Sequence, residues 1–233
     1  MSCLLVLGSK PEPALPPLDR FDAVACANAS GFSAARCGLP VPVFTVMSSI
    51  LTSGKNDSNR LAVDALRGLR TRHLYLFPRR PFQRKPWKQV LHLGKMVRTT
   101  APFVRRQLQR IGYHYDELIT KPAAYYLDLV AGVCGNDPEI RRLIARKVPS
   151  VGMLAVAVGL AEHGFERIIL SGFSFEITHA YAINPLIAER GSTLSRHADT
   201  DISALQAIQR RRNCLFTTEQ VVSQRTGIPL LVD

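Results

Sequence analysis

The sequence lacks any pair of cysteines at the close spacing of zinc or redox motifs. Its five cysteines are odd in number, and several lie in apolar runs: Cys3, Cys26, Cys37, Cys134 and Cys214. This pattern predicts reduced, mostly buried thiols in a reducing compartment rather than a disulfide framework. No cysteine and histidine cluster has zinc-ligand spacing either, so a structural zinc site is not expected.

Long apolar runs are also missing. The longest covers residues 151–161, whereas a helix that crosses a bilayer needs roughly 20 apolar residues. The N-terminus shows neither the basic segment nor the long apolar segment of a secretory signal. We therefore expect a cytoplasmic protein that contacts a membrane only at its surface, on the inner face.

Acidic residues are absent between Asp64 and Asp116, although the whole chain carries a formal net charge of +12. The thirteen basic residues of that stretch are Arg67, Arg70, Arg72, Arg79, Arg80, Arg84, Lys85, Lys88, Lys95, Arg98, Arg105, Arg106 and Arg110. Such a local basic face predicts an anionic partner, which is nucleic acid, anionic lipid or a phosphorylated glycan. Nearby aromatic residues such as Trp87 could stack on nucleic-acid bases, but no known RNA-binding or zinc-finger signature supports that partner.

The 233 residues are 46% hydrophobic, which is enough for a substantial core in one domain. Short apolar runs alternate with helical patterns, so we expect an α/β fold with a mostly parallel sheet flanked by helices. Expected strands cover 3–7, 21–27, 41–46, 73–77, 167–170, 213–216 and 229–232. Expected helices cover 61–69, 87–111 with a break at Pro102, 138–147 capped by Asp137, 151–162 capped by Ser150, 200–212 capped by Thr200, and 218–224. One domain, 1–233, would contain a basic helical insertion or lid at 79–115.

The common nucleotide and hydrolase fingerprints are missing too. Gly8-Ser9-Lys10 follows the first expected strand but matches neither the P-loop nor the dinucleotide glycine pattern. Because ligands bind beyond the carboxyl ends of parallel strands, this turn either contacts a ligand or is only a turn. Ser171-Gly172-Phe173-Ser174-Phe175 follows a buried strand, but it is not the nucleophile elbow of a hydrolase.

Two further segments suggest an anion site and a base. Ser150-Val151-Gly152 opens an apolar helix, whose free N–H groups favour an anion and whose glycine would let a ligand approach; a capped core helix is the alternative. Tyr181 and His179 lie in a polar loop and could donate to a phosphate. His197 precedes another helix, where an accessible imidazole would titrate near neutrality as a general base does. Taken singly, each residue fits a structural role better.

Asp199-Thr200-Asp201 spells the acidic motif with which many sugar-nucleotide transferases bind a divalent metal. Here the motif falls at the start of an expected helix, where aspartate and threonine are common capping residues. Helix capping is therefore favoured over metal binding.

In order and spacing, these segments resemble the bacterial sialyltransferases that use CMP-sialic acid and, more distantly, the animal sialyltransferases. The resemblance is carried by 149–157, 169–175, Tyr181-Ala182, and His197 with 200–205, and more weakly by 5–9 and 22–28. It covers roughly half of the chain and leaves residues 55–135 unmatched.

The resemblance implies a GT-A-like α/β fold, a CMP-activated donor, inversion at the anomeric carbon and no metal cofactor. His197 would deprotonate the acceptor hydroxyl, and Tyr181 would hydrogen-bond the leaving phosphate. Asn28 would contact the cytidine side. The remaining residues implied to line the CMP pocket are Gly8, Ser9, Ser150, Val151, Gly152, Gly172, Phe173 and Ser174.

One departure from the bacterial pattern concerns Glu176, which stands where a second phosphate-binding tyrosine is expected. A carboxylate is a poor partner for a phosphate, so His179 or an arginine would have to replace it. The donor sugar therefore stays open between sialic acid and Kdo, another 2-ulosonic acid carried by CMP. A basic face suits a phosphate-rich glycolipid or lipopolysaccharide acceptor. The rival hypotheses are a nucleic-acid-binding protein and an inactive relative that binds CMP or a glycan.

Overall fold

The computed structural model describes residues 1–54, 56–78, 96–178 and 194–231. A seven-stranded sheet with strand order β5-β4-β3-β2-β1-β6-β7 runs through them, and every pairing in it is parallel. Its strands are β1 Cys3–Leu7, β2 Ala23–Ala27, β3 Phe44–Ser48, β4 Arg70–Phe77, β5 His114–Thr120, β6 Arg167–Ser171 and β7 Leu215–Thr217. The expected α/β class with a parallel sheet is confirmed.

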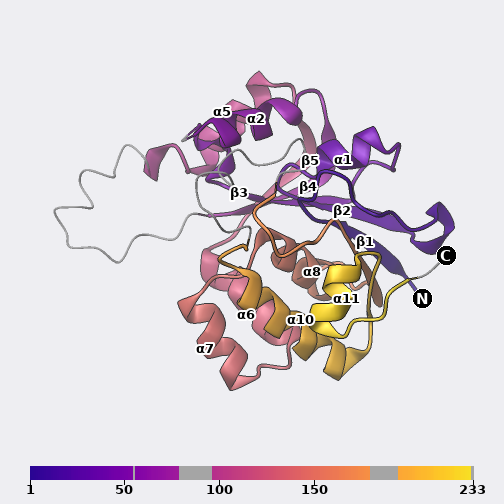
Figure 1. Cartoon of the computed structure of the whole chain (residues 1–233). Coiled ribbons are helices and arrows are strands. Elements are labelled where there is room, and N and C mark those ends of the chain that lie inside the picture. Colours follow the sequence, from indigo (N-terminus) through magenta and orange to yellow (C-terminus); the bar gives the residue numbers. More distant parts are fainter. Residues whose placement is uncertain (55, 79–95, 179–193, 232–233) are drawn as a thin grey trace.

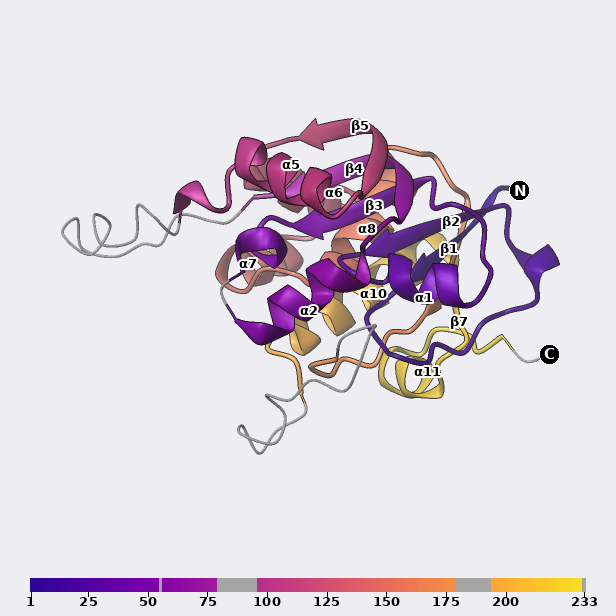
Figure 2. The ribbon, with the colours of Figure 1, turned by 90° about the horizontal axis from the view of Figure 1, so that it is seen from above.

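Helices cover both faces of the sheet (Figures 1 and 2). One face carries α1 Gly31–Arg36, α2 Asp57–Ala65 and α5 Ala101–Arg110. The other carries α6 Ala123–Val133, α7 Pro138–Arg146, α8 Val151–Ala161, α10 Ala198–Arg212 and α11 Gln220–Thr226. Short 3-10 turns cover Leu18–Arg20 and Leu51–Ser53. No helix in the described ranges is both long and apolar enough to span a bilayer.

The side chains of β1 explain why this strand lies inside the sheet. All five of its residues are buried, and alternate residues of a strand point to opposite faces. Leu4 and Val6 join the core beneath α8, whereas Leu5 and Leu7 join the core beneath α1. An apolar run without alternation is what a strand covered on both faces requires.

Helix α8 is buried on nearly every side, as its composition predicts. It contacts strands β1, β2, β3 and β6 on one side and helices α6 and α10 on the other. Ser150 caps it as expected, by accepting a hydrogen bond from the N–H of Met153. Asp137 likewise caps α7 through the N–H groups of Glu139 and Ile140.

The sequence-based elements differ from the structure in several places. Helix α5 begins at Ala101, so Pro102 lies in its first turn, where proline is tolerated, and does not break a longer helix. Helix α1, strand β5 and helix α6 were not expected, and α2 covers Asp57–Ala65 instead of the expected 61–69. Thr200 does not cap α10, which begins at Ala198. In place of a terminal strand at 229–232, the described residues form a single bridge between Thr217 and Leu230.

Part of the expected insertion or lid at 79–115 packs onto the sheet. Val104 and Leu108 of α5 are buried with Leu74 and Leu76 of β4, and β5, which begins at His114, pairs with β4. Residues 79–95 lie outside the described residues.

The approach of α8 to β1 predicts a difference between two glycine substitutions in helices. At Gly159 an added Cβ would lie 2.6 Å from Cδ2 of the fully buried Leu4, whereas at the exposed Gly132 of α6 it would meet nothing. Gly159→Ala should therefore lower the free energy of unfolding by about 1–3 kcal/mol through overpacking. Gly132→Ala should raise it by about 0.5–1 kcal/mol through backbone entropy. Urea denaturation measures both values, and equal effects would contradict the packing of α8 on β1.

Candidate active site

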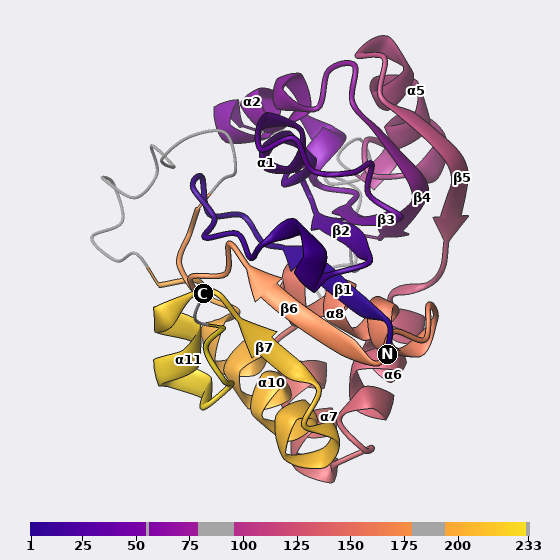
Figure 3. The ribbon, with the colours of Figure 1, turned by 90° about the vertical axis from the view of Figure 1, so that its right-hand side faces the viewer.

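The candidate site lies where the strand order reverses. β1 is between β2 and β6, and Leu7 pairs with Ser171 at the carboxyl ends of the two strands (Figure 3). The chain passes from β1 through β2 to β5 on one side and then returns to β6 on the other. In open parallel sheets, ligands bind beyond the carboxyl ends of strands at such a switch point.

The two chain segments that leave β1 and β6 touch each other through glycines. The N–H of Gly8 donates to Ser171 O at 2.8 Å, and the N–H of Lys10 donates to Gly172 O at 2.9 Å. A Cβ at Gly8 would overlap the carbonyl oxygen of Gly172. Gly172 has φ +70°, a conformation that favours glycine. Both glycines are therefore needed for the close approach of these two segments.

Ser9 and Asn28 lie at the same edge of the sheet. Ser9 Oγ is 3.1 Å from Thr178 Oγ1, which ties the turn after β1 to the chain after β6. Asn28 has φ +54° and accepts a hydrogen bond from Ser48 N at 2.9 Å through Oδ1. Its Nδ2 group has no acceptor among the described residues, so it can donate to a ligand.

The start of α8 is partly occupied by the protein's own groups. The N–H of Ser150 donates to Asp201 Oδ1 at 2.8 Å, and Ser150 Oγ accepts the N–H of Met153. Because the first N–H groups of a helix have no partner within it, Val151 and Gly152 are left with donors that no described residue accepts. An anion at this end of α8 would meet those two amides.

On its Cα side, Gly152 makes room for a side chain of the protein itself, and only its backbone N–H remains to meet a ligand. A Cβ at Gly152 would lie 2.8 Å from Cε1 of Phe173, so the phenyl ring occupies that space. Phe173 is itself buried in the core beneath α8. Gly152 and Phe173 thus pack against each other. Ser174 is half-buried, and its Oγ accepts the N–H of Glu176 at 3.3 Å.

The three residues of the acidic motif, Asp199-Thr200-Asp201, lie in different surroundings, and none of them caps α10. Asp199 is exposed and pairs with Lys147 Nζ at 2.6 Å. Thr200 is fully buried within the first turn of α10. Asp201 is buried and accepts from Ser150 at the start of the neighbouring helix α8 instead. Within 1–54, 56–78, 96–178 and 194–231, no three cysteine, histidine or acidic side chains gather as metal ligands.

His197 occupies the N-cap position of α10. Its Nδ1 is 2.6 Å from the carbonyl oxygen of Val148, which can only accept, so Nδ1 carries the proton. Nε2 therefore holds the lone pair, and Arg196 Nε donates to it at 3.2 Å. This is the tautomer that a general base needs.

The environment of His197 differs from the accessible loop that the sequence suggested. The side chain is half-buried, and burial lowers the pKa of His197 below its usual 6.5. The positive charges of Arg196 and Lys147 lower this pKa further, whereas the hydrogen bond to Val148 opposes the shift. His197 is consequently neutral at pH 7.

The segments before and after residues 179–193 are joined to each other. The N–H of Ser195 donates to Phe175 O at 2.8 Å, and Glu176 forms an antiparallel bridge with Leu194. Phe175 has φ +57°, which is strained for a bulky residue and is common at functional sites. These contacts connect the end of β6 with His197. Tyr181 and His179 lie outside the described residues, and Glu176 is exposed.

Two buried carboxylates at this edge were missed by the sequence analysis. The sequence pattern places Asp201 in an acidic motif and gives Glu219, at the start of α11, no role. Both accept hydrogen bonds from residues more than 40 positions away in the chain. No local pattern signals such contacts.

Comparison with known proteins identifies solved structures only; no family model and no curated protein matches this chain. The monofunctional α-2,3-sialyltransferase Cst-I from Campylobacter jejuni is 13% identical, with a TM-score of 0.54 over 100% of this chain and 81% of that one. The sialyltransferase CstII from Campylobacter jejuni, with the substrate analogue CMP-3FNeuAc, is 15% identical, with a TM-score of 0.52 over 99% and 86%. CstII with a trisaccharide acceptor and CMP is 15% identical, with a TM-score of 0.53 over 97% and 86%. The chain therefore has the GT-A-like fold of these sialyltransferases, as the resemblance implied.

The buried carboxylate of Asp201 predicts an unusual dependence of stability on pH. Burial raises the pKa of Asp201 from 3.8 to about 7, so between these values the folded protein binds a proton that the unfolded chain releases. Stability from this group is therefore greatest at low pH and is lost as the pH rises through that window. Asp201→Asn keeps an oxygen for Ser150 N–H without this titration. Relative to the wild type, the variant should gain stability as the pH is raised from 5 to 8.

Thermal or urea unfolding at pH 5, 6, 7 and 8 measures this difference. Asp201→Ala is the matched control: like Asp201→Asn it lacks the titrating carboxyl, but it also leaves the Ser150 amide without an acceptor, so it should be about 1–3 kcal/mol less stable than Asp201→Asn at every pH. Parallel pH profiles for the wild type and Asp201→Asn would contradict a buried carboxylate at this position.

Proposed function

We propose that this protein is an inverting glycosyltransferase that moves a 2-ulosonic acid from a CMP-activated donor to a glycan acceptor. The observation that carries the proposal is His197, a neutral imidazole whose Nε2 is free of a proton, at the carboxyl edge of a sialyltransferase-like fold. At the switch point, where a nucleotide would bind, Gly8 and Gly172 form tight turns and the side-chain amide of Asn28 is available as a donor.

The reaction is a single displacement. The acceptor hydroxyl oxygen attacks C2 of the donor sugar while Nε2 of His197 takes its proton, so one C–O bond forms as the bond between C2 and the phosphate oxygen breaks. CMP leaves with the electron pair of the broken bond. The amides of Val151 and Gly152 would stabilise the negative charge on the departing phosphate. Tyr181 keeps the phosphate-binding role that the resemblance implies.

Arg196 must move before this reaction can begin. Its Nε–H donates to the same Nε2 atom that receives the acceptor proton. Arg196 is exposed, so its guanidinium can leave Nε2 and bind an anionic group of an arriving acceptor instead.

The donor and acceptor are proposed from chemistry. The solved neighbours contain CMP, the donor analogue CMP-3FNeuAc or a trisaccharide acceptor, which favours sialic acid as the sugar. Kdo is the second candidate, because it is also a CMP-linked 2-ulosonic acid and because Glu176 departs from the sialyltransferase pattern. In either case we propose a glycolipid or lipopolysaccharide-type acceptor and no metal cofactor.

We propose that the basic surface on the face of the sheet covered by α1, α2 and α5 contacts an anionic membrane. Arg60, Arg67 and Arg70 pair with Asp57, Asp64 and Asp116. In contrast, the exposed basic side chains on α5 have no ion-pair partner within the described ranges; they are Arg105, Arg106 and Arg110. Val97, directly before α5, exposes 57% of its surface. Unpaired arginines beside exposed apolar groups suit a lipid surface better than nucleic acid.

His197→Gln should abolish transfer without abolishing CMP binding. Removing a general base typically lowers kcat about 10²–10⁴-fold. In the wild type, the acid limb of kcat/KM should lie below pH 6.5, because burial lowers the pKa of His197. Arg196→Gln should move this limb to higher pH, since the arginine charge contributes to that shift. The assay follows CMP release from CMP-sialic acid and from CMP-Kdo, with and without a phosphorylated glycolipid.

Release from one donor that depends on His197 would support the proposal and would identify the sugar. CMP binding without turnover from either donor would favour the inactive relative. No CMP binding, combined with RNA or DNA binding that weakens steeply with salt, would contradict the transferase and favour the nucleic-acid-binding protein.

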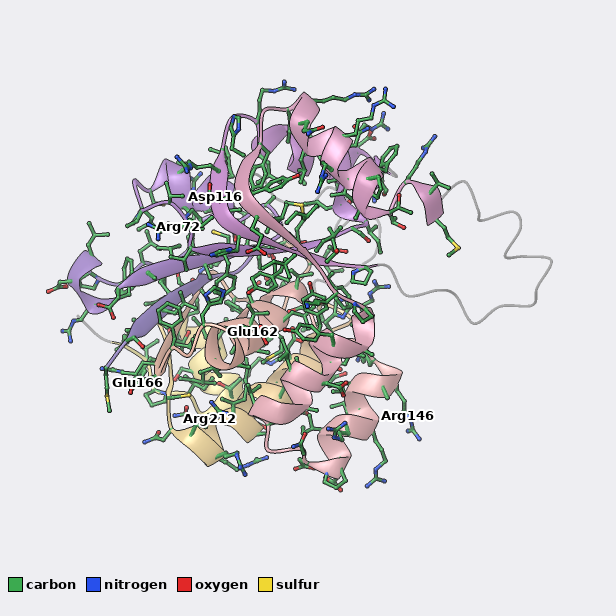
Figure 4. All side chains as sticks on the ribbon, turned by 180° about the vertical axis from the view of Figure 1, so that it is seen from behind. Arg72, Asp116, Arg146, Glu162, Glu166 and Arg212 are labelled. Atoms are coloured by element: carbon green, nitrogen blue, oxygen red, sulfur yellow. The ribbon has the colours of Figure 1, made fainter. Side chains whose placement is uncertain are left out.

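The membrane contact predicts a position-dependent effect of charge reversal. Arg105→Glu with Arg106→Glu should reduce binding to vesicles containing phosphatidylserine at least tenfold, since each arginine near the surface contributes about 1 kcal/mol. The matched control is Arg142→Glu with Arg146→Glu on α7, which makes the same charge change in the opposite helical layer (Figure 4). Vesicle sedimentation measures both. Equal losses in the two double variants would show that only net charge matters.

A further inference from the structure

Glu219 is a buried acidic side chain at the carboxyl edge of the sheet that the proposed reaction does not use. It lies between β7 and α11, and its side chain is 4% exposed. Its Oε1 accepts the backbone N–H of Gly172 at 2.9 Å and that of Ala14 at 3.0 Å. Its Oε2 accepts from Lys10 Nζ at 2.6 Å. One carboxylate thus joins the chain after β1, the proline-rich loop and the chain after β6.

Other hydrogen bonds hold the same loop in place. Ser171 Oγ donates to Ala14 O at 2.6 Å, and Thr218 Oγ1 donates to the same oxygen. The N–H of Lys10 donates to Gly172 O. The Gly172 residue is therefore fixed at both its N–H and its C=O, directly beside Gly8.

Stability alone is a weak reason for burying this carboxylate. Removing a charge from water is costly, and buried ion pairs are often no more stabilising than apolar residues of similar volume. The bonds around Glu219 do, however, define the positions of three backbone segments that meet at the switch point. A site with fixed donors loses less freedom when a ligand binds, which strengthens binding.

We propose that Glu219 is a positioning residue for the CMP-activated donor. It fixes the Gly8-Ser9 turn and Gly172 before the nucleotide arrives, and it acts through Gly172, Ala14 and Lys10 without touching the donor. This inference rests on the proposed function, because it takes the nucleotide to bind at these turns.

Three variants separate positioning from general stability. Glu219→Leu removes both acceptor oxygens, whereas Glu219→Gln keeps one oxygen for the amides of Gly172 and Ala14, and the half-exposed Lys10 can turn to solvent. Asp22→Ala is the matched control, because Asp22 Oδ2 also binds a backbone amide, that of Cys3 at 2.7 Å, but at the opposite edge of the sheet. Calorimetry measures the Kd for CMP, and donor kinetics give KM and kcat.

Glu219→Leu should weaken CMP binding at least tenfold and raise the donor KM more than it lowers kcat. Glu219→Gln should stay within about threefold of the wild type, and Asp22→Ala should leave the Kd unchanged. A Glu219→Leu variant that binds CMP as the wild type does would overturn the inference, and so would an equal loss in Asp22→Ala.

Amide hydrogen exchange in the wild type tests the same inference even if Glu219→Leu fails to fold. The amide of Gly172 should exchange slowly in the free protein, as slowly as the amides in the core of β6. Fast exchange that slows only when CMP binds would overturn the inference that Gly172 is fixed before the nucleotide arrives. A wild type that does not bind CMP at all would overturn the proposed function itself, so the two failures are distinguishable.

Discussion

The close approach of the chain segments that leave β1 and β6 is the constraint on which the candidate site depends. Gly8 and Gly172 are in contact there because neither residue has a side chain. All strands are parallel, so β1, β2 and β3 end at the same edge of the sheet as β6, and the segments that follow these strands begin there. Helix α8, which precedes β6, presents its N-terminus at this edge, and α10 begins beside it through the bond between Ser150 and Asp201. A larger residue at Gly8 would separate these parts.

Burial sets the charge states of the two titratable groups near the start of α8, His197 and Asp201. His197 is held neutral because burial and the nearby charges of Arg196 and Lys147 disfavour its protonation, and its lone pair lies on Nε2 because Nδ1 donates to the carbonyl oxygen of Val148. Asp201 lies in the first turns of α10 and accepts a hydrogen bond from the start of α8. Burial disfavours its negative charge and so raises its pKa. The amides that remain available at the start of α8 are those of Val151 and Gly152. An uncharged base next to unpaired backbone donors suits a reaction that releases an anionic phosphate.

The parts of this fold that local chemistry determines could be predicted from the sequence. The continuous apolar runs of β1 and β6 and the cap at Ser150 depend on neighbouring residues only, and each was predicted. Strand β5 was missed because it is an edge strand whose sequence alternates charged and apolar residues weakly. The role of Asp201 was missed because its partner lies 51 residues away and on another helix. Thr200 has the chemistry of a cap, but the helix starts two residues before it.

The candidate site was predicted in its location more than in its detail. The structure places His197, Gly8 and Gly172 at one edge of the sheet, and their roles toward CMP stay a prediction. The exact partners of these residues depend on tertiary contacts, as the packing of Phe173 on Gly152 and the buried bonds of Glu219 show. Such contacts join residues far apart in the chain, which no periodicity reveals.

The most direct test of this account is a titration of the isotopically labelled protein with CMP, followed through its backbone amide resonances. The account predicts that the largest shifts occur at Gly8, Asn28, Val151, Gly152 and Gly172, which lie at the carboxyl edge of the sheet. Shifts confined to the basic helix α5, or no shifts at millimolar CMP, would contradict a nucleotide site between β1 and β6.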